Sequence, residues 1–315
     1  MYVTPVLKGI VTFMPGVKNF VAKRTGGTDS ARYCYAVWLR HLLMAYENGL
    51  SVEPKIVAEI GPGDSLGIGL AALISGSEKY YAFDIIKYAN YERNTLIFDE
   101  LVDLFARKER IPDNVEFPNI KPHLKSYDFP AHVLSECRLT ECLKQERINT
   151  IRKSLEHLND NEETNIQYFV PWNDVKIIKE RSVDMIFSQA VLEHVDDLEN
   201  TYEKQYSWLK PHGFVSHQID FKSHGITKEW NGHWKYTKFT WKIIQGSRPY
   251  SLNRQPHSTH IKLLEKNNFR ILCDIKTENL DGIRREHLAA EFCDIPRDDL
   301  VCSGAFIQAV KIVPG

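Results

Sequence analysis

The sequence predicts a doubly wound α/β domain, with seven strands in a mostly parallel sheet and a helical insertion. Short apolar runs typical of buried strands alternate along the chain with helical segments. One strand also passes into a helix through the turn Gly61-Pro62-Gly63, and ligands bind at such turns in doubly wound sheets. The strands are expected at 56–60, 79–84, 166–170, 183–188, 214–219, 269–275 and 305–312.

Helices are expected on both sides of these strands. The segment 28–49 has polar N-cap candidates at 28–30, apolar residues at three-and-four spacing, and Gly49 at its end. Further helices are expected at 66–74, 96–106, 134–158, 191–209 and 260–267.

The alternation of strands and helices divides the chain. Residues 1–53 are expected to form an N-terminal helical cover, and residues 54–312 the main domain. Within that domain, 92–160 interrupts the alternation and is predicted to be a helical insertion, serving as a lid or an acceptor-side cover. The segment 220–257 has little apolar periodicity and is predicted to be a long functional loop with one short helix.

Composition places the chain among soluble globular proteins. Of 315 residues, 43% are hydrophobic and 26% charged, and the net charge of −1 does not favour nucleic acid as a partner. The six cysteines are scattered, as expected for reduced thiols in a cytoplasmic protein. No run is long enough to span a membrane. Residues 1–24 lack the unbroken apolar region of a signal peptide, and we expect them to pack over the domain rather than lie on a membrane.

Five short motifs occur in the order expected of one known fold family. They are Glu59-Ile-Gly-Pro-Gly63, the acid Asp84 about 20 residues after the turn, Pro171-Trp-Asn-Asp174, Ser188-Gln-Ala-Val-Leu-Glu-His-Val195 and Leu209-Lys-Pro-His-Gly213. With these motifs the chain resembles the class I S-adenosylmethionine-dependent methyltransferases, whose fold is Rossmann-like. The resemblance runs from about residue 54 to 312, apart from the insertion.

Three further stretches make the resemblance closer. Ala31-Arg-Tyr-Cys-Tyr35, Ser216-His-Gln-Ile-Asp220 with His224, and Asn253-Arg254 are similar to a bacterial subgroup often associated with glycan and cell-surface polysaccharide biosynthesis.

A dinucleotide-binding oxidoreductase is the rival interpretation of the turn. Its fingerprint places a third glycine where this chain has Leu66. Glu59 and Asp64 also flank the turn, and carboxylates there would repel a pyrophosphate. They suit a ligand that carries an amine and a sulfonium, so the charge pattern favours S-adenosylmethionine as the cofactor.

The resemblance assigns cofactor contacts to this chain. It implies that Gly61, Pro62 and Gly63 pass the methionine part, with Glu59 near the amine. Asp84 is expected to hold the ribose hydroxyls, as an acid at the tip of a second strand can.

It also implies contacts at the other end of the cofactor. Asn173 or Asp174 would meet the adenine amine, although both equally suit an ordinary turn. Ser188 or Gln189 would line the cofactor at the tip of the fourth strand.

Four residues are candidates for the catalytic step. Methyl transfer to a hydroxyl needs positioning and a base, for which histidine suits neutral pH. We expect His224 and Asp220 to act as base and orienting carboxylate. His217 equally suits a core role, and His194 is the weakest candidate. His217, Asp220 and His224 are also competent metal ligands, but their spacing is not diagnostic and we predict no metal site.

The segment 222–254 has its own charge and aromatic pattern. Its cations are Lys222, Lys228, Lys235, Lys238, Lys242, Arg248 and Arg254, against one acid, Glu229. Its large aromatic residues include Trp230, Trp234, Tyr236 and Trp241. These side chains suit a phosphorylated or acidic sugar, and equally suit a solvated loop with aromatics tucked beneath it.

The sequence therefore predicts an enzyme that uses S-adenosylmethionine to methylate a hydroxyl of a sugar, nucleotide-sugar or glycan intermediate. Anionic acceptors are included in this prediction. A methyltransferase of a small metabolite amine or hydroxyl is the second hypothesis, and a non-catalytic cofactor-binding scaffold is the third. The sequence does not predict the oligomeric state.

Overall fold

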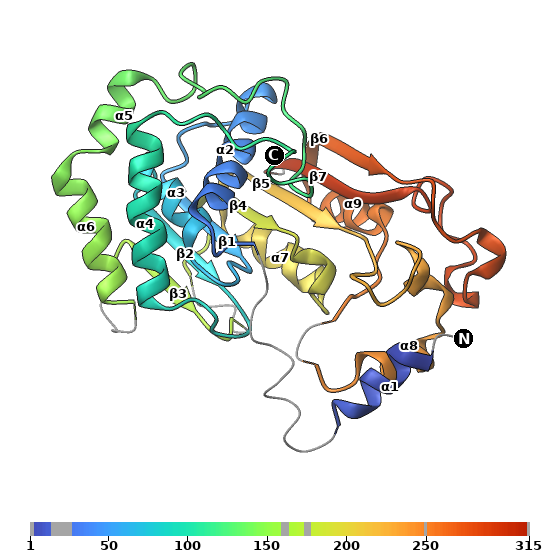
Figure 1. Cartoon of the computed structure of the whole chain (residues 1–315). Coiled ribbons are helices and arrows are strands. Elements are labelled where there is room, and N and C mark those ends of the chain that lie inside the picture. Colours follow the sequence, from blue (N-terminus) through green and yellow to red (C-terminus); the bar gives the residue numbers. More distant parts are fainter. Residues whose placement is uncertain (1–2, 14–26, 159–163, 173–177, 249–250, 314–315) are drawn as a thin grey trace.

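The computed structural model describes residues 3–13, 27–158, 164–172, 178–248 and 251–313. These residues form a seven-stranded sheet with helices on both faces (Figure 1). The strands are β1 (Ile56–Ile60), β2 (Lys79–Phe83), β3 (Ile166–Phe169), β4 (Val183–Gln189), β5 (Leu209–Asp220), β6 (Phe269–Glu278) and β7 (Cys302–Lys311). Their order is β3-β2-β1-β4-β5-β7-β6, and only β7 runs antiparallel to its neighbours. The predicted doubly wound sheet is confirmed.

The helices alternate with these strands along the chain, as predicted. They are α1 (Val3–Val11), α2 (Ala31–Glu47), α3 (Gly67–Ile74), α4 (Tyr91–Ala106), α5 (Glu136–Cys142), α6 (Gln145–Glu156), α7 (Leu198–Trp208), α8 (Lys238–Gln245) and α9 (His257–Lys266). Short 3-10 turns include η2 (Leu192–His194) and η3 (Gly232–Lys235). At the start of α2, the Ser30 hydroxyl accepts a hydrogen bond from the Tyr33 amide, so the expected N-cap is in place.

Two predicted boundaries differ from the structure. The helix expected over 191–209 is the turn η2 followed by the separate helix α7. The Pro211-Gly213 stretch, expected to end that helix, lies within β5 instead. There the pairing of β4 with β5 shifts register between Val183 and Met185. Such an irregularity accommodates a proline, which has no N–H to donate to the ladder.

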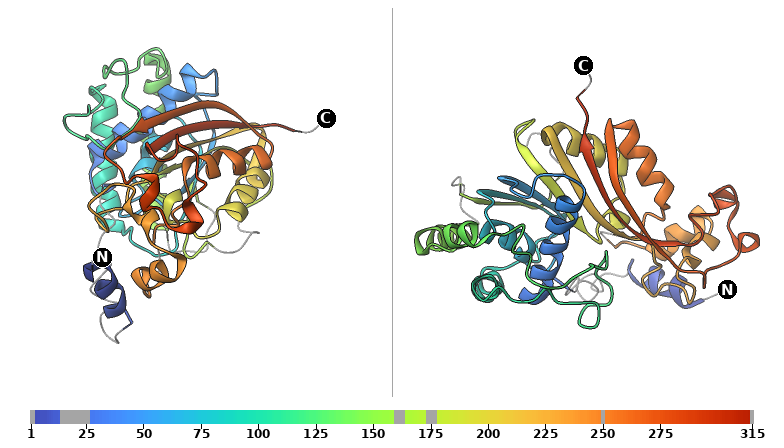
Figure 2. Two further views of the ribbon diagram at one scale, coloured as in Figure 1. Left: turned by 90° about the vertical axis from the view of Figure 1, so that its right-hand side faces the viewer. Right: turned by 90° about the horizontal axis from the view of Figure 1, so that it is seen from above.

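The sheet has a hydrophobic layer on each face. Helices α2, α3 and α4 cover one face, where Trp38, Phe98 and Phe105 are fully buried (Figure 2). Helices α7 and α9 cover the other, with Tyr202 and Trp208 in the core. Both faces of the central strands are thereby buried, so these strands read as continuous apolar runs.

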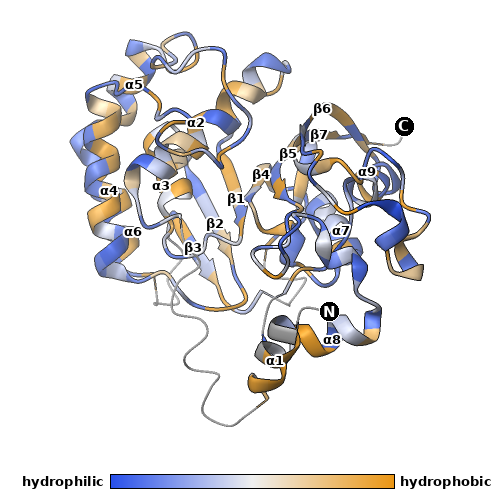
Figure 3. Ribbon diagram, turned by 45° about the vertical axis from the view of Figure 1, so that its right-hand side comes forward, coloured by the Kyte–Doolittle hydropathy of each residue, from blue (hydrophilic) through white to orange (hydrophobic). Residues whose placement is uncertain are grey.

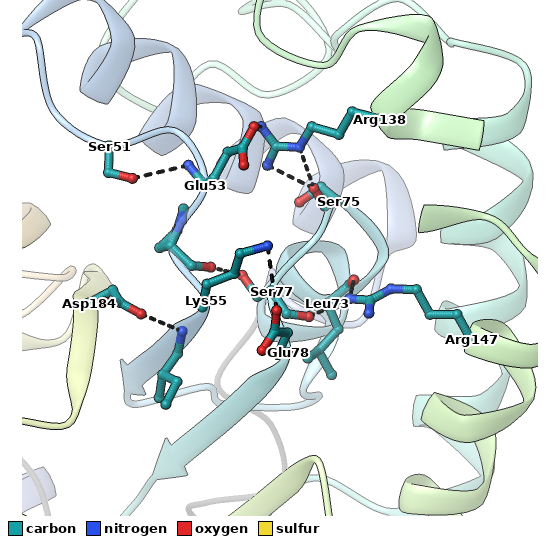
Figure 4. Close-up of polar contacts among 12 residues, drawn as sticks. Ser51, Glu53, Lys55, Leu73, Ser75, Ser77, Glu78, Arg138, Arg147 and Asp184 are labelled. Carbon is teal, nitrogen blue, oxygen red and sulfur yellow. Dashed lines mark hydrogen bonds and ion pairs between the residues drawn. The ribbon is translucent and has the colours of Figure 1, made fainter. Parts of the chain in front are cut away.

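The insertion contacts the sheet domain in two places: Arg93 donates to the Asp64 carbonyl at 3.2 Å, next to the Gly61 turn, and α5 and α6 are fixed at the other end of the strands. The Arg138 guanidinium donates from Nη2 to the carbonyls of Val52 (2.8 Å) and Ser75 (2.9 Å). Arg147 likewise donates to the carbonyl of Leu73 at 2.9 Å (Figure 4). These carbonyls lie at the entrances to β1 and β2, whereas the Gly61 turn follows the exit of β1. The role of the insertion as a lid or acceptor-side cover stays a prediction.

The N-terminal helix packs beside α8, as Figure 3 also shows. A side chain at Gly9 would come within 2.0 Å of the Ile243 carbonyl oxygen, so the two helices touch through backbone. The Ser247 amide donates to the Thr12 hydroxyl at 2.9 Å. Among the described helices, none combines the length and apolar content that a membrane span requires.

Three histidines are buried in the core as neutral hydrogen-bonding groups. His41 Nδ1 lies 2.7 Å from the Ser216 hydroxyl, and His260 Nδ1 lies 3.0 Å from the Tyr202 hydroxyl. His217 joins the Ser188 hydroxyl to Gln205. Burial disfavours the imidazolium and lowers the pKa of each of the three histidines to about 3.

Acid is therefore expected to destabilise the fold. The unfolded chain protonates its histidines near pH 6.5 and the folded chain near pH 3, so stability is full above 6.5 and falls as pH drops below it. Each group contributes up to about 1.4 kcal/mol per pH unit. Glu59 has the opposite effect, because its pKa of about 8 lets the folded chain bind one proton more than the unfolded chain over this pH range. Urea unfolding at pH 7, 6 and 5 measures the slope, which His260→Gln should reduce. An equal slope in both proteins would contradict this prediction.

Candidate active site

A cavity of about 760 Å³ opens where the first, second and fourth strands end. In a doubly wound sheet this is the edge where ligands bind. Its walls come from several places along the chain: the start of α2, the Gly61 turn, the segments after β2 and β3, the segment from β4 into α7, and the loop after β5. Lining residues include Gly61, Pro62, Gly63, Asp84, Trp172, Gln189, Val191, His194, His224 and Arg248.

The Gly61 turn requires glycine for two reasons. Gly61 and Gly63 have φ of 70° and 73°, in the left-handed region. A Cβ atom at Gly61 would also lie 2.5 Å from the Val191 side chain. The turn is held from the second strand, because the Gly61 amide donates to the Phe83 carbonyl at 2.8 Å. The bare backbone of the turn thus forms one wall of the cavity.

Asp84 stands beside this turn at the tip of β2. Its Oδ1 accepts from the Ile85 amide at 2.7 Å, and its Oδ2 accepts from the Gly63 amide at 3.3 Å. Burial raises its pKa, although these backbone hydrogen bonds oppose that effect. A carboxylate has about four acceptor positions, so Asp84 keeps capacity for hydroxyl donors from the cavity.

Other predicted cofactor residues occupy different places. Glu59 is buried beneath the turn, outside the cavity, where its carboxyl accepts from the Tyr80 hydroxyl at 2.5 Å. Burial raises the pKa of Glu59 to about 8, so it is largely protonated near neutral pH. Ser188 is also buried, and its hydroxyl hydrogen-bonds to His217 at 2.8 Å. Asn173 and Asp174 lie outside the described residues.

Two of the four catalytic candidates meet at one end of the cavity. The rings of His194 and His224 lie edge to face, with centroids 5.1 Å apart. Asp220 Oδ2 is 3.9 Å from Nε2 of His224 and 3.2 Å from Nζ of Lys222. His217, by contrast, is fully buried behind the sheet edge and does not line the cavity.

Two residues that were not predicted to reach the cavity lie at the start of α2, Thr28 just before the helix and Tyr33 in its first turn. Thr28 and Tyr33 line the cavity opposite the strand ends. The Thr28 hydroxyl accepts from the Ser65 amide at 3.1 Å, which ties this segment to the turn that leads into α3. The Ala31–Tyr35 motif contains Tyr33, but nothing in its pattern indicates that it reaches the cavity.

The loop after β5 differs from expectation in its aromatic residues. Trp230, Trp234, Tyr236 and Trp241 are buried and none lines the cavity. Trp230 and Trp234 belong to the hydrophobic core on the α7 and α9 face of the sheet, and Tyr236 and Trp241 to a small separate cluster. Arg254 is buried with them, its guanidinium carbon 4.9 Å from the centre of the Trp241 ring.

The cations of this loop are placed unequally. Of the seven cations that the sequence singled out there, Arg248 lines the cavity and none of the other six does.

Comparison with known proteins agrees with this geometry. Residues 147–216, which run from α6 through β4 into β5, match a family described as "Methyltransferase domain". No curated protein sequence matches this chain.

Several solved structures are similar to this chain in the arrangement of their strands and helices. A putative S-adenosylmethionine-dependent methyltransferase from Listeria monocytogenes is 15% identical, with 89% of this chain and 98% of that chain covered and a TM-score of 0.42. A methyltransferase from Methanosarcina mazei is 14% identical, with 85% and 97% covered and a TM-score of 0.44. Phosphoethanolamine N-methyltransferase 2 of Haemonchus contortus is 14% identical, with 95% and 61% covered and a TM-score of 0.44.

Proposed function

We propose that this protein is an S-adenosylmethionine-dependent methyltransferase that acts on a hydroxyl of a sugar, nucleotide-sugar or glycan intermediate. The observation that carries the proposal is the meeting of His194 and His224 at the end of the cavity, beyond the Gly61 turn. Arg248 lines the same cavity and supplies a cation for an acidic or phosphorylated acceptor. The enzyme's free cysteines suit the reducing cytoplasm, where we place it.

The cavity fits the cofactor at three points. The glycine backbone at 61–63 leaves room that any side chain would fill, and Asp84 has acceptor capacity for two ribose hydroxyls. Gln189 lines the wall between them and the acceptor end. Asn173 or Asp174 is our proposed partner for the adenine amine. Glu59 and Ser188 act from beneath, by supporting the strand ends.

The chemistry needs few groups from the protein. Bound S-adenosylmethionine supplies an electrophilic methyl group, and its sulfur keeps the electron pair of the broken carbon–sulfur bond. The chain's own residues orient the acceptor hydroxyl and take up its proton. His224, with Asp220 beside it, is the candidate proton acceptor, and His194 faces the same space.

An acceptor panel with methyl-labelled cofactor tests this proposal. We expect label on neutral sugars, nucleotide-sugars or sugar phosphates, with the anionic acceptors preferred. Arg248→Gln should lower kcat/KM for an anionic acceptor by about 10- to 100-fold, because it removes one charged hydrogen bond. Lys242→Gln is the matched control, since Lys242 is exposed on α8 and does not line the cavity.

The same panel separates the second candidate, a small-metabolite acceptor. Asp196 and Asp197 also line the cavity and favour an amine. The sugar proposal would be contradicted if label were found only on amines. It would also be contradicted if Arg248→Gln and Lys242→Gln had equal kcat/KM for an anionic acceptor.

A further inference from the structure

Three side chains with metal-ligand chemistry converge at the acceptor end of the cavity. One ligand atom from each of Glu193, His194 and His224 lies within 4.8 Å of the other two. The first two belong to η2, which follows β4, and His224 follows the adjacent parallel strand β5. The topology of the sheet therefore brings together residues thirty positions apart.

Glu193 is the unusual member of this group. It is 2% exposed, and neither carboxylate oxygen makes a hydrogen bond to any residue that the structure describes. A buried ionised carboxylate needs a compensating charge or donor. A cation shared with the two imidazoles beside it would supply that compensation.

The turn that presents Glu193 and His194 is held firmly. The Asn253 side chain donates to the carbonyls of Leu192 at 2.7 Å and Val195 at 2.8 Å, which flank the pair. The Asn253 amide donates to the Glu193 carbonyl at 2.8 Å. These three bonds fix η2 from a segment sixty residues away, so the two side chains are presented from a braced turn rather than a free loop.

We propose that Glu193, His194 and His224 bind one divalent transition-metal cation. Two imidazoles and one carboxylate are a ligand set found in catalytic zinc sites and in non-haem iron sites. Ligand atoms about 2.1 Å from an ion lie about 3–4 Å apart, so small side-chain rotations close the site. His194 and His224 line the cavity, so an acceptor hydroxyl bound there would be close to the cation.

This inference rests on the proposed function and sharpens it. A divalent cation lowers the pKa of a coordinated hydroxyl, which eases loss of the proton to water as the oxygen gains the methyl group. His224 then acts as a ligand, and Asp220 beside it acts as an orienting carboxylate. The cation site also lies next to the cofactor turn, because Val191 of the same segment faces Gly61.

Metal titration of the purified full-length protein, stripped with a chelator, tests the site. Co²⁺ is the first probe, because imidazole ligands give its visible absorption a distinct signature, and Mn²⁺ is the second. We expect one equivalent to bind and to raise the thermal midpoint. His224→Asn should weaken binding at least 10-fold, since asparagine tolerates the positive φ of 48° at this position.

His212→Asn is the matched control. His212 also has a positive φ, of 65°, and is exposed within β5, outside the cavity. Glu193→Gln keeps the side-chain shape and should weaken binding as His224→Asn does. Equal binding by wild type and both site variants, or no binding by wild type at millimolar metal, would overturn the metal site.

The two proposals fail in different ways. Full turnover of a sugar acceptor in the presence of chelator would contradict the metal proposal and support the proposed function. If metal binding depended on His224 but no sugar was methylated, the metal site would be supported and the sugar acceptor would be contradicted.

Discussion

Gly61→Ala is expected to reduce affinity for S-adenosylmethionine by about 100-fold or more, which corresponds to about 3 kcal/mol. The added Cβ would lie 2.5 Å from the Val191 side chain, which is closer than atoms in proteins approach. The turn must then move, and the cavity wall moves with it. Calorimetric titration of the cofactor measures the loss, and a thermal melt shows that the variant remains folded.

Gly49→Ala is a close control for this substitution. Gly49 has φ of 69° against 70° at Gly61, but a Cβ atom there meets nothing within 4 Å. Both variants carry the same left-handed backbone strain, of about 1–2 kcal/mol. Only Gly61→Ala should lose the cofactor. Equal affinities in the two variants would show that the turn is not part of the cofactor site.

Asp84→Asn is expected to have the next largest effect, a loss of cofactor affinity of about 10- to 100-fold. The substitution removes the charge and replaces one acceptor oxygen with a donor, which weakens hydrogen bonds from the ribose hydroxyls. Its backbone contacts to Gly63 and Ile85 are also affected, so the control must reproduce that part of the change.

Asp113→Asn supplies that control. Asp113 also accepts a backbone hydrogen bond through Oδ1, from the Val115 amide at 2.9 Å, but it lies outside the cavity. It should leave cofactor affinity unchanged. If Asp84→Asn bound the cofactor as tightly as Asp113→Asn does, the proposed ribose contact would be wrong.

Much of the fold was predictable because its signals are local. The strand ending at Ile60, the turn after it and the acid at 84 depend on short-range patterns that the sequence states directly. The cap at Ser30 is equally local. Their meeting at one sheet edge follows from the parallel topology, so the position of the cavity followed from the sequence as well.

The direction in which strand residues point was not predictable in the same way. The central strands are buried on both faces, so no polar-apolar alternation marks which side chains reach the cavity. Glu59 and His217 are polar, which suggested the site, yet both turn into the interior and find partners there. Polarity in a strand end therefore did not distinguish a cavity residue from a hydrogen-bonded core residue.

Long-range docking explains the other differences. Arg138 and Arg147 fasten α5 and α6 of the insertion to backbone carbonyls at the end of the strands opposite the cavity, and no sequence pattern predicted these contacts. The loop aromatics were candidates for stacking on a sugar, but Trp234 packs beneath the loop, where its Nε1 donates to the Arg254 carbonyl at 2.9 Å. Both outcomes depend on contacts between distant segments, which sequence patterns do not specify.

The most direct test of the account compares S-adenosylmethionine with NAD⁺ in calorimetric titrations of the wild-type protein. We predict one S-adenosylmethionine site per chain and no measurable NAD⁺ binding at millimolar concentration, because the buried Asp64 beside the turn disfavours a pyrophosphate and Leu66 stands at the third glycine position. NAD⁺ binding as tightly as S-adenosylmethionine, or no S-adenosylmethionine binding at all, would contradict it.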